Sequence, residues 1–296
     1  MKHTLKITIV LVSLFLLAQI IGLASVSSYI KVEKTAGGET VIEHSETIAG
    51  KPPEVKEKSL SFIPLMIAVF IGTALVLVLI RFGMRRLWKI WFFLSVWITL
   101  AISFDVYTTR IFAAAAALIL ALAKVFRPNV FVHNFTEIFI YTGVTIVILP
   151  FLNLFSGFMI LLLISVYDMY AVWKSRHMIK MAEFQAKNNV FAGLLLQYKK
   201  RERRGGKEGK KKSAILGGGD IAFPLMFSAA VMEHLILKNG LAKNTAFIEA
   251  SIIPLFVSIA LFLLFANGKK DRYYPAMPFL SLGCLAGFVA ILLINL

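Results

Sequence analysis

The chain has 296 residues, of which 58% are hydrophobic and 16% are charged, and its net charge is +16. With a mean hydropathy of +0.79, this composition excludes an ordinary water-soluble globular protein and predicts an all-α membrane protein. In a soluble protein such a positive charge would suggest nucleic acid, but here the basic residues gather in loops between apolar segments, so no nucleic-acid partner is expected. The single cysteine, Cys284, excludes an intrachain disulfide.

Nine segments are candidates to cross a bilayer, for which a helix needs about 20 apolar residues. In chain order they span about 5–30, 61–80, 88–104, 111–126, 132–151, 154–173, 214–235, 246–266 and 275–295. The first segment has the basic start of a signal peptide. Its apolar core is longer than the about 7–15 residues usual in signal peptides, which favours a retained helix.

The positions of lysine and arginine predict the orientation of these spans. With a cytoplasmic N-terminus, 24 of the 32 basic residues fall in inner loops. The positive-inside rule therefore predicts nine transmembrane helices in the cell membrane, with the N-terminus cytoplasmic and the C-terminus extracytoplasmic. The chain then divides into an N-terminal six-helix part (1–173), a basic cytoplasmic loop (174–213) and a C-terminal three-helix part (214–296).

The basic loop contains two distinct stretches. The tract YKKRERRGGKEGKKK at 198–212 is typical of a flexible linker that lies against anionic lipid. Ahead of it, VFAGLLLQ at 190–197 is apolar but too short to span a bilayer. It has two interpretations, an interfacial helix or a segment that lies over a site.

Two aspartates lie well inside predicted spans, Asp168 in LLLISVYDMYAV and Asp220 in LGGGDIAFP. Glu137, Glu233 and Glu249 lie near span ends, where a carboxylate can reach the headgroups. A carboxylate inside a span costs roughly 2.5–3.5 kcal/mol on insertion scales, so a function is expected for the aspartates. At about 1.5 Å per residue, both lie roughly 9–12 Å below the inner boundary on successive antiparallel helices, so they can meet.

Two carboxylates that meet in a low-dielectric site hold one proton between them. The ionised carboxylate can take a proton from water, while the protonated one donates to a carbonyl oxygen. This chemistry needs no metal and no cofactor, and the five histidines show no metal-ligand spacing. No cofactor is therefore expected.

The glycines before the second aspartate, Gly217, Gly218 and Gly219, each weaken helix propensity by roughly 1 kcal/mol. A loosened helix start lets water and a substrate backbone approach Asp220. The alternative is close packing of helices through small residues.

The segment YYPAMPFL at 273–280 lies at the inner end of the last span. Pro275 and Pro278 leave backbone groups unpaired there, which is tolerated where the backbone lines a cavity. Such an edge could pair with an unwound substrate strand. The alternative is a helix start marked by proline.

VYD, GGGD and PAMP resemble the YD, GxGD and PAL motifs of the presenilin and signal peptide peptidase family of intramembrane aspartyl proteases. Their order and the nine-helix count match, so the resemblance covers nearly the whole chain. It implies a presenilin-like fold, hydrolysis of peptide bonds within transmembrane segments, and Asp168 and Asp220 as the catalytic pair. The expected substrate-binding residues, with Met277 standing where the family has leucine, are Tyr167, Gly217, Gly218, Gly219, Pro275, Ala276, Met277 and Pro278.

The resemblance also implies the partners, which are the lipid bilayer and single-span proteins with the N-terminus outside, cut near the inner face. We expect a substrate helix to enter between the sixth and ninth helices and to pair near 275–278. The short chain fits a microbial, archaeal homologue. The alternatives are a proton-coupled transporter with midplane carboxylates, a prepilin-peptidase-like enzyme, and a structural membrane protein with a buried carboxyl pair.

Overall fold

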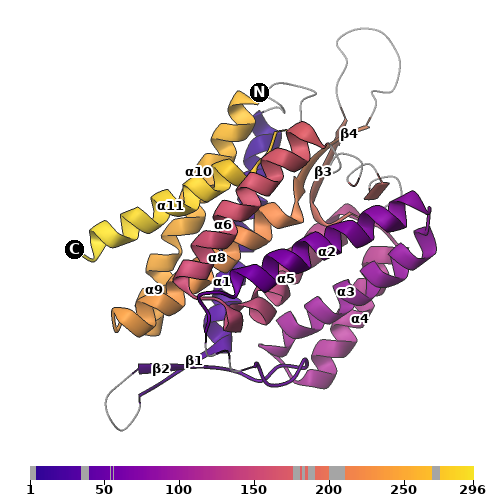
Figure 1. The fold of residues 1–296 in the computed structure, drawn as a ribbon. Helices are drawn as coiled ribbons and strands as arrows, with labels where there is room; N and C mark the ends of the chain where they lie inside the picture. The colour runs from indigo at the N-terminus through magenta and orange to yellow at the C-terminus, as the bar shows by residue number, and fades with distance from the viewer. Residues whose placement is uncertain are drawn as a thin grey trace.

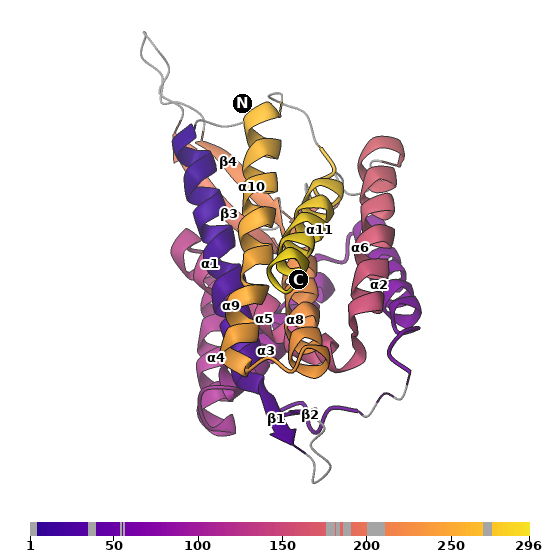
Figure 2. The same cartoon turned by 90° about the vertical axis from the view of Figure 1, so that its left-hand side faces the viewer.

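The structure is a computed structural model that describes most of the chain as a helical bundle with two short antiparallel β-sheets (Figures 1 and 2). The described residues are 5–34, 40–53, 55, 57–175, 181, 184–185, 191–199, 211–268 and 274–296. Most of the predicted basic loop 174–213, including most of its tract at 198–212, lies outside the described residues, as does Tyr273.

Ten α-helices lie within the described residues. They are α1 (Leu5–Tyr29), α2 (Phe62–Arg81), α3 (Arg85–Asp105), α4 (Arg110–Phe126), α5 (Val130–Ile148), α6 (Leu154–Met169), α8 (Gly218–Lys238), α9 (Lys243–Ala250), α10 (Ile252–Asn267) and α11 (Met277–Ile294). A 3-10 turn, η1 (Leu149–Phe151), extends α5, and a π-helical turn, η2 (Tyr170–Lys174), extends α6. Among the described residues, eight stretches are long and apolar enough to cross a membrane, with α9 and α10 forming one stretch. The remaining predicted span is α4, which has 17 residues.

The helices begin and end close to the predicted boundaries, with two informative differences. The predicted span 214–235 begins only at Gly218, because the residues up to Gly217 form a strand. The predicted span 246–266 is divided between α9 and α10 at Ser251. Pro254 explains this break, because it lacks an N–H and its ring clashes with the carbonyl of the residue four positions earlier, Ala250.

The first sheet pairs β1 (Ile30–Lys34) with β2 (Thr40–His44), directly after α1. The second pairs β3 (Gly193–Lys199) with β4 (Lys211–Gly217), with Gly193 opposite Gly217. The two sheets lie at opposite ends of the bundle (Figures 1 and 2).

Residues 193–197 of the apolar stretch 190–197 therefore belong to a strand, and the interpretation of these residues as an interfacial helix is wrong. Leu194 and Leu216, opposite each other in β3 and β4, are both buried against the bundle. Seven residues suffice for a strand once a neighbouring strand satisfies their backbone groups, whereas a free helix of that length would be marginal.

Helix α8 occupies the centre of the bundle and is the most buried of the candidate spans among the described residues. Phe227 of α8 packs edge-on against Phe158 of α6, with ring centroids 4.9 Å apart. Gly157 of α6 leaves room for the same ring, since a Cβ there would lie 3.3 Å from it. Because α8 packs against α1, α5, α6 and α11, the position of its first turn, which carries Asp220, is fixed by the surrounding helices.

Candidate functional site

Asp168 is the next-to-last residue of α6, two residues before the π-helical turn η2 begins, and it is 4% exposed. Its Oδ2 accepts a hydrogen bond of 3.1 Å from the backbone N–H of Met277, and the backbone N–H of Ala276 also donates to this carboxylate. Met277 is the first residue of α11, whose N–H has no partner within its own helix. The start of α11 thus serves as a donor site for the Asp168 carboxylate.

A second contact closes the seam between α6 and α11. The hydroxyls of Ser165 and Ser281 lie 2.8 Å apart, and Ser165 also donates to the carbonyl oxygen of Leu161 at 2.7 Å. Both serines are buried. The VYD and PAMP motifs are therefore held side by side by contacts on two successive turns of α6.

Asp220 is the third residue of α8 and is half-buried. Gly217 is the N-cap, and Gly218 lies against the Tyr141 ring of α5, where a Cβ would come within 2.6 Å of the phenolic oxygen. Tyr141 is also close enough to interact electrostatically with Asp220. A carboxylate in the first turn of a helix is favoured by the helix dipole.

The three motifs converge at one end of the bundle, where α6, α8 and α11 pack against one another (Figure 2). Asp168 contacts Ala276 and Met277 directly, while Asp220 lies on the neighbouring helix.

Tyr167 contacts α2. Its hydroxyl donates to Thr73 Oγ1 at 3.2 Å, and its ring packs edge-on against Phe70 with centroids 5.3 Å apart. In this conformation Tyr167 connects α6 to α2.

The structure shows no strand at 275–278, and pairing of this segment with an unwound substrate stays a prediction. Proline has no N–H to donate, and the N–H groups of Ala276 and Met277 both point to Asp168. The carbonyl of Ala276 accepts from Phe279 and Leu280, each at 3.1 Å. Met277 and Pro278 begin α11, so this part of the segment is a helix start marked by proline, while Pro275 and Ala276 lie before the helix.

Two carboxylates that were expected to reach the headgroups are buried in the structure. Glu137 is 1% exposed and pairs at 2.6 Å with Lys124 of α4, which is itself 3% exposed. Glu233 is 5% exposed and lies 2.5 Å from Nε2 of His44 in β2. Lys124 lies two residues before the end of α4, whereas Glu137 is the eighth residue of α5, so the sequence around either residue does not mark them as a pair. Glu249 differs, since it accepts from Asn295 at an exposed position.

Within the part of the chain that the structure describes, no group of three or more His, Cys, Asp or Glu side chains is placed to hold a metal ion.

The family model described as signal-peptide peptidase, presenilin aspartyl protease, matches residues 12–295. No curated protein matches the chain. Among solved structures, a presenilin family intramembrane aspartate protease is similar in two crystal forms. The first is 19% identical with a TM-score of 0.60 and 96% of each chain covered. The second is 20% identical with a TM-score of 0.53, covering 95% of this chain and 94% of the other. Because the identity is this low, the two solved structures show a similar fold only. Membership of the family is shown by the family model, which matches nearly the entire sequence. The chain belongs to the signal-peptide peptidase and presenilin family of intramembrane aspartyl proteases.

Proposed function

We propose that this protease cleaves transmembrane segments with a water molecule held between Asp168 and Asp220. The observation that carries the proposal is the convergence of α6, α8 and α11, which brings the buried Asp168 to the start of α11 and next to the helix of Asp220. Carboxylates at this depth of an apolar bundle are expensive, and a shared proton lowers that cost.

The reaction follows from the two protonation states of the pair. The ionised carboxylate takes a proton from water, and the resulting hydroxide oxygen bonds to the substrate carbonyl carbon. The protonated carboxyl donates its proton to the carbonyl oxygen, which gives a neutral tetrahedral intermediate. When the C–N bond breaks, the nitrogen takes the proton that the first carboxylate received from water and leaves as an amine. One hydroxyl of the intermediate returns its proton to the second carboxylate, so the other product is a carboxylic acid and the pair again holds one proton.

The substrate helix enters beside α2 rather than between α6 and α11. The seam between α6 and α11 is closed by hydrogen bonds at Ser165 and Asp168. An apolar cavity of about 260 Å³ lies instead between α2, α6, α8 and the end of α5. Its lining residues are Leu65, Met66, Ala68, Val69, Ile148, Ile160, Phe223 and Met226. Phe223 is one turn beyond Asp220, so this cavity leads towards the carboxylates.

The outer edge of β4 is the place for the unwound part of the substrate. Side chains of α5 bind the backbone groups of Gly193 and Leu195, so these groups point away from β4. In an antiparallel ladder the residues opposite them, Gly217 and Ile215, then direct their backbone groups away from β3. A substrate strand added to this edge would run alongside the approach to Asp220.

The proposal includes nine spans in the cell membrane, with α4 crossing as well, and a cytoplasmic N-terminus. Substrates would be single-span proteins with the N-terminus outside.

A cysteine introduced by Lys174→Cys should react with a membrane-impermeant maleimide only from the inner side, and one introduced by Lys51→Cys only from the outer side. Both are made in a Cys284→Ala chain. The reverse pattern would contradict the orientation.

The direct test uses purified enzyme in liposomes with a model single-span substrate and mass-spectrometric detection of fragments. Asp168→Asn and Asp220→Asn keep the shape of each side chain and should each lower the cleavage rate by about 10²–10⁴-fold or more. Asp105→Asn, at the end of α3, is the control and should cleave like wild type. Persistent cleavage in both site variants would exclude the dyad, and proton-coupled solute flux without fragments would favour the transporter, for which the comparisons give no support.

A further inference from the structure

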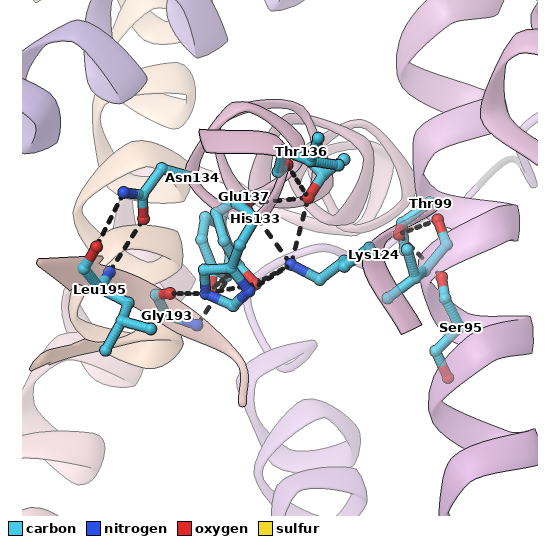
Figure 3. Close-up of polar contacts among 12 residues, drawn as sticks. Ser95, Thr99, Lys124, His133, Asn134, Thr136, Glu137, Gly193 and Leu195 are labelled. Atoms are coloured by element: carbon cyan, nitrogen blue, oxygen red, sulfur yellow. Dashed lines mark hydrogen bonds and ion pairs between the residues drawn. The ribbon is translucent and has the colours of Figure 1, made fainter. Parts of the chain in front are cut away.

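A buried polar network lies beside the candidate site, where α4, α5 and β3 meet (Figure 3). Its centre is the ion pair between Lys124 and Glu137, whose Nζ and Oε1 atoms are 2.6 Å apart and whose side chains are each 1% exposed. The catalytic mechanism proposed above uses neither residue.

Lys124 has a partner for each of its three N–H groups. Its ammonium contacts Glu137 Oε1 at 2.6 Å, Thr136 Oγ1 at 3.1 Å and His133 Nδ1 at 3.2 Å. On the other side of the histidine ring, Nε2 lies 2.8 Å from the carbonyl oxygen of Gly193. Since a carbonyl oxygen only accepts, the hydrogen-bond pattern assigns the proton to Nε2, and His133 is neutral.

Glu137 connects this ion pair to the strand and to Tyr141. Its Oε2 accepts from the backbone N–H of Gly193 at 3.0 Å and from the hydroxyl of Tyr141. Nearby on α5, Asn134 donates to the carbonyl of Leu195 at 2.8 Å and accepts from its N–H at 2.9 Å. The backbone of β3 is thus bonded to α5 at two alternate residues, as Figure 3 shows.

The network reaches the first turn of α8 by two routes. The Tyr141 ring, held by Glu137, packs against Gly218. The strand region, held at Gly193, accepts the N–H of Gly218 at the carbonyl of Ala192, at 3.2 Å. Any shift of Glu137 would therefore be transmitted to the glycines that precede Asp220.

Stability alone does not explain a buried ion pair at this position. Replacing such a pair with apolar residues of similar volume is often neutral or stabilising. A network in which every donor and acceptor is matched instead fixes one geometry. We propose that Lys124 and Glu137 are positioning residues, which hold β3 and Tyr141 and thereby set the place of Asp220. This inference rests on the proposed function, because the place of Asp220 matters most if it belongs to the dyad.

The test compares two double variants that share Lys124→Met. The first adds Glu137→Leu, which removes the acceptor for Gly193 and Tyr141. The second adds Glu137→Gln, which keeps an oxygen that can accept from Gly193. Neither leaves a lone buried charge, so both should fold. The leucine variant should lose about tenfold to a hundredfold in kcat with KM little changed, since a misplaced catalytic group acts on the chemical step. The glutamine variant should recover most of that loss.

A second measurement does not depend on activity. Hydrogen–deuterium exchange of the peptide that covers 211–220 should be faster in the leucine variant than in the glutamine variant. The control is Tyr107→Phe, which removes a tyrosine hydroxyl that is hydrogen-bonded to Ser25 at 2.7 Å and lies outside this network, and should change neither readout.

Equal exchange in the two double variants would overturn the inference whatever the activity. The inference would also be overturned if both double variants lost kcat in the same proportion to their fall in unfolding temperature. That result would mean that the residues have only a structural role. If wild type itself leaves the substrate intact while exchange differs as expected, the proposed function fails and the positioning contact remains.

Discussion

The three glycines before Asp220 have different surroundings, although they are adjacent in the sequence. A Cβ on Gly218 would collide with the Tyr141 ring, at 2.6–3.0 Å from three of its atoms. A Cβ on Gly219 would meet only the Phe223 ring, at 3.4 Å, and this position is exposed. Both residues have ordinary backbone angles for the start of a helix, so the difference lies in the neighbours.

We expect Gly218→Ala and Gly219→Ala to have opposite effects on stability. Gly218→Ala should lower both the unfolding temperature and the cleavage rate. Gly219→Ala should stabilise the fold by up to about 1 kcal/mol, because alanine is the better helix former, yet lower cleavage, since its methyl occupies the open side beside Asp220. Thermal unfolding and cleavage measured on the same preparations decide this. Unchanged cleavage in Gly219→Ala would remove Gly219 from the substrate-binding residues.

The sequence predicted single functional residues only where the free-energy cost of burying a charge follows from its position within a span. Asp168 and Asp220 were identifiable because a carboxylate far from any span end has few explanations. Lys124 and Glu137 were missed because each lies near a span end, where a charge is normally solvated. Their burial depends on β3 covering that end of the bundle, and no local pattern of α4 or α5 contains this information.

At the scale of elements, β4 offers a sharp comparison between neighbouring residues. The N–H of Ile215 points away from β3, whereas that of Leu216 points towards it, as follows from the alternation of the ladder. Ile215→Pro should therefore preserve the sheet and lower cleavage by removing one donor from the outer edge. Leu216→Pro should disrupt the sheet and lower the unfolding temperature. Cleavage by Ile215→Pro at the wild-type rate would argue against substrate pairing at this edge.

Helices and strands could be predicted where they depend only on residues that are close together in the sequence. Long apolar segments place a helix in a bilayer wherever they occur, so the helices were predicted to within a few residues. The strands were not predicted, because β3 needs both β4, beyond the residues 200–210, and α5, which lies far earlier in the sequence, to satisfy its backbone. The break at Ser251 was visible in principle from Pro254, a proline inside an otherwise continuous apolar segment.

For the whole molecule, the closed seam between α6 and α11 predicts which helices stay together during turnover. Ser165→Cys with Ser281→Cys, made in a Cys284→Ala chain, should form a disulfide, because the two hydroxyls are 2.8 Å apart. The oxidised enzyme should retain its activity. Cleavage that is lost on oxidation and restored by a reductant would mean that the substrate passes between α6 and α11, as the sequence alone had suggested.

The bond between Asp168 and the start of α11 also has a consequence for biosynthesis. A ribosome delivers both aspartates to the membrane well before it delivers Met277, whose N–H completes the surroundings of Asp168. Until then the growing chain holds Asp168 without the backbone N–H of Met277. A chain that ends after Gly268 should insert into the membrane but should not cleave substrates. The enzyme would therefore become active only once α11 has been synthesised, and neighbouring membrane proteins would not be cleaved before then.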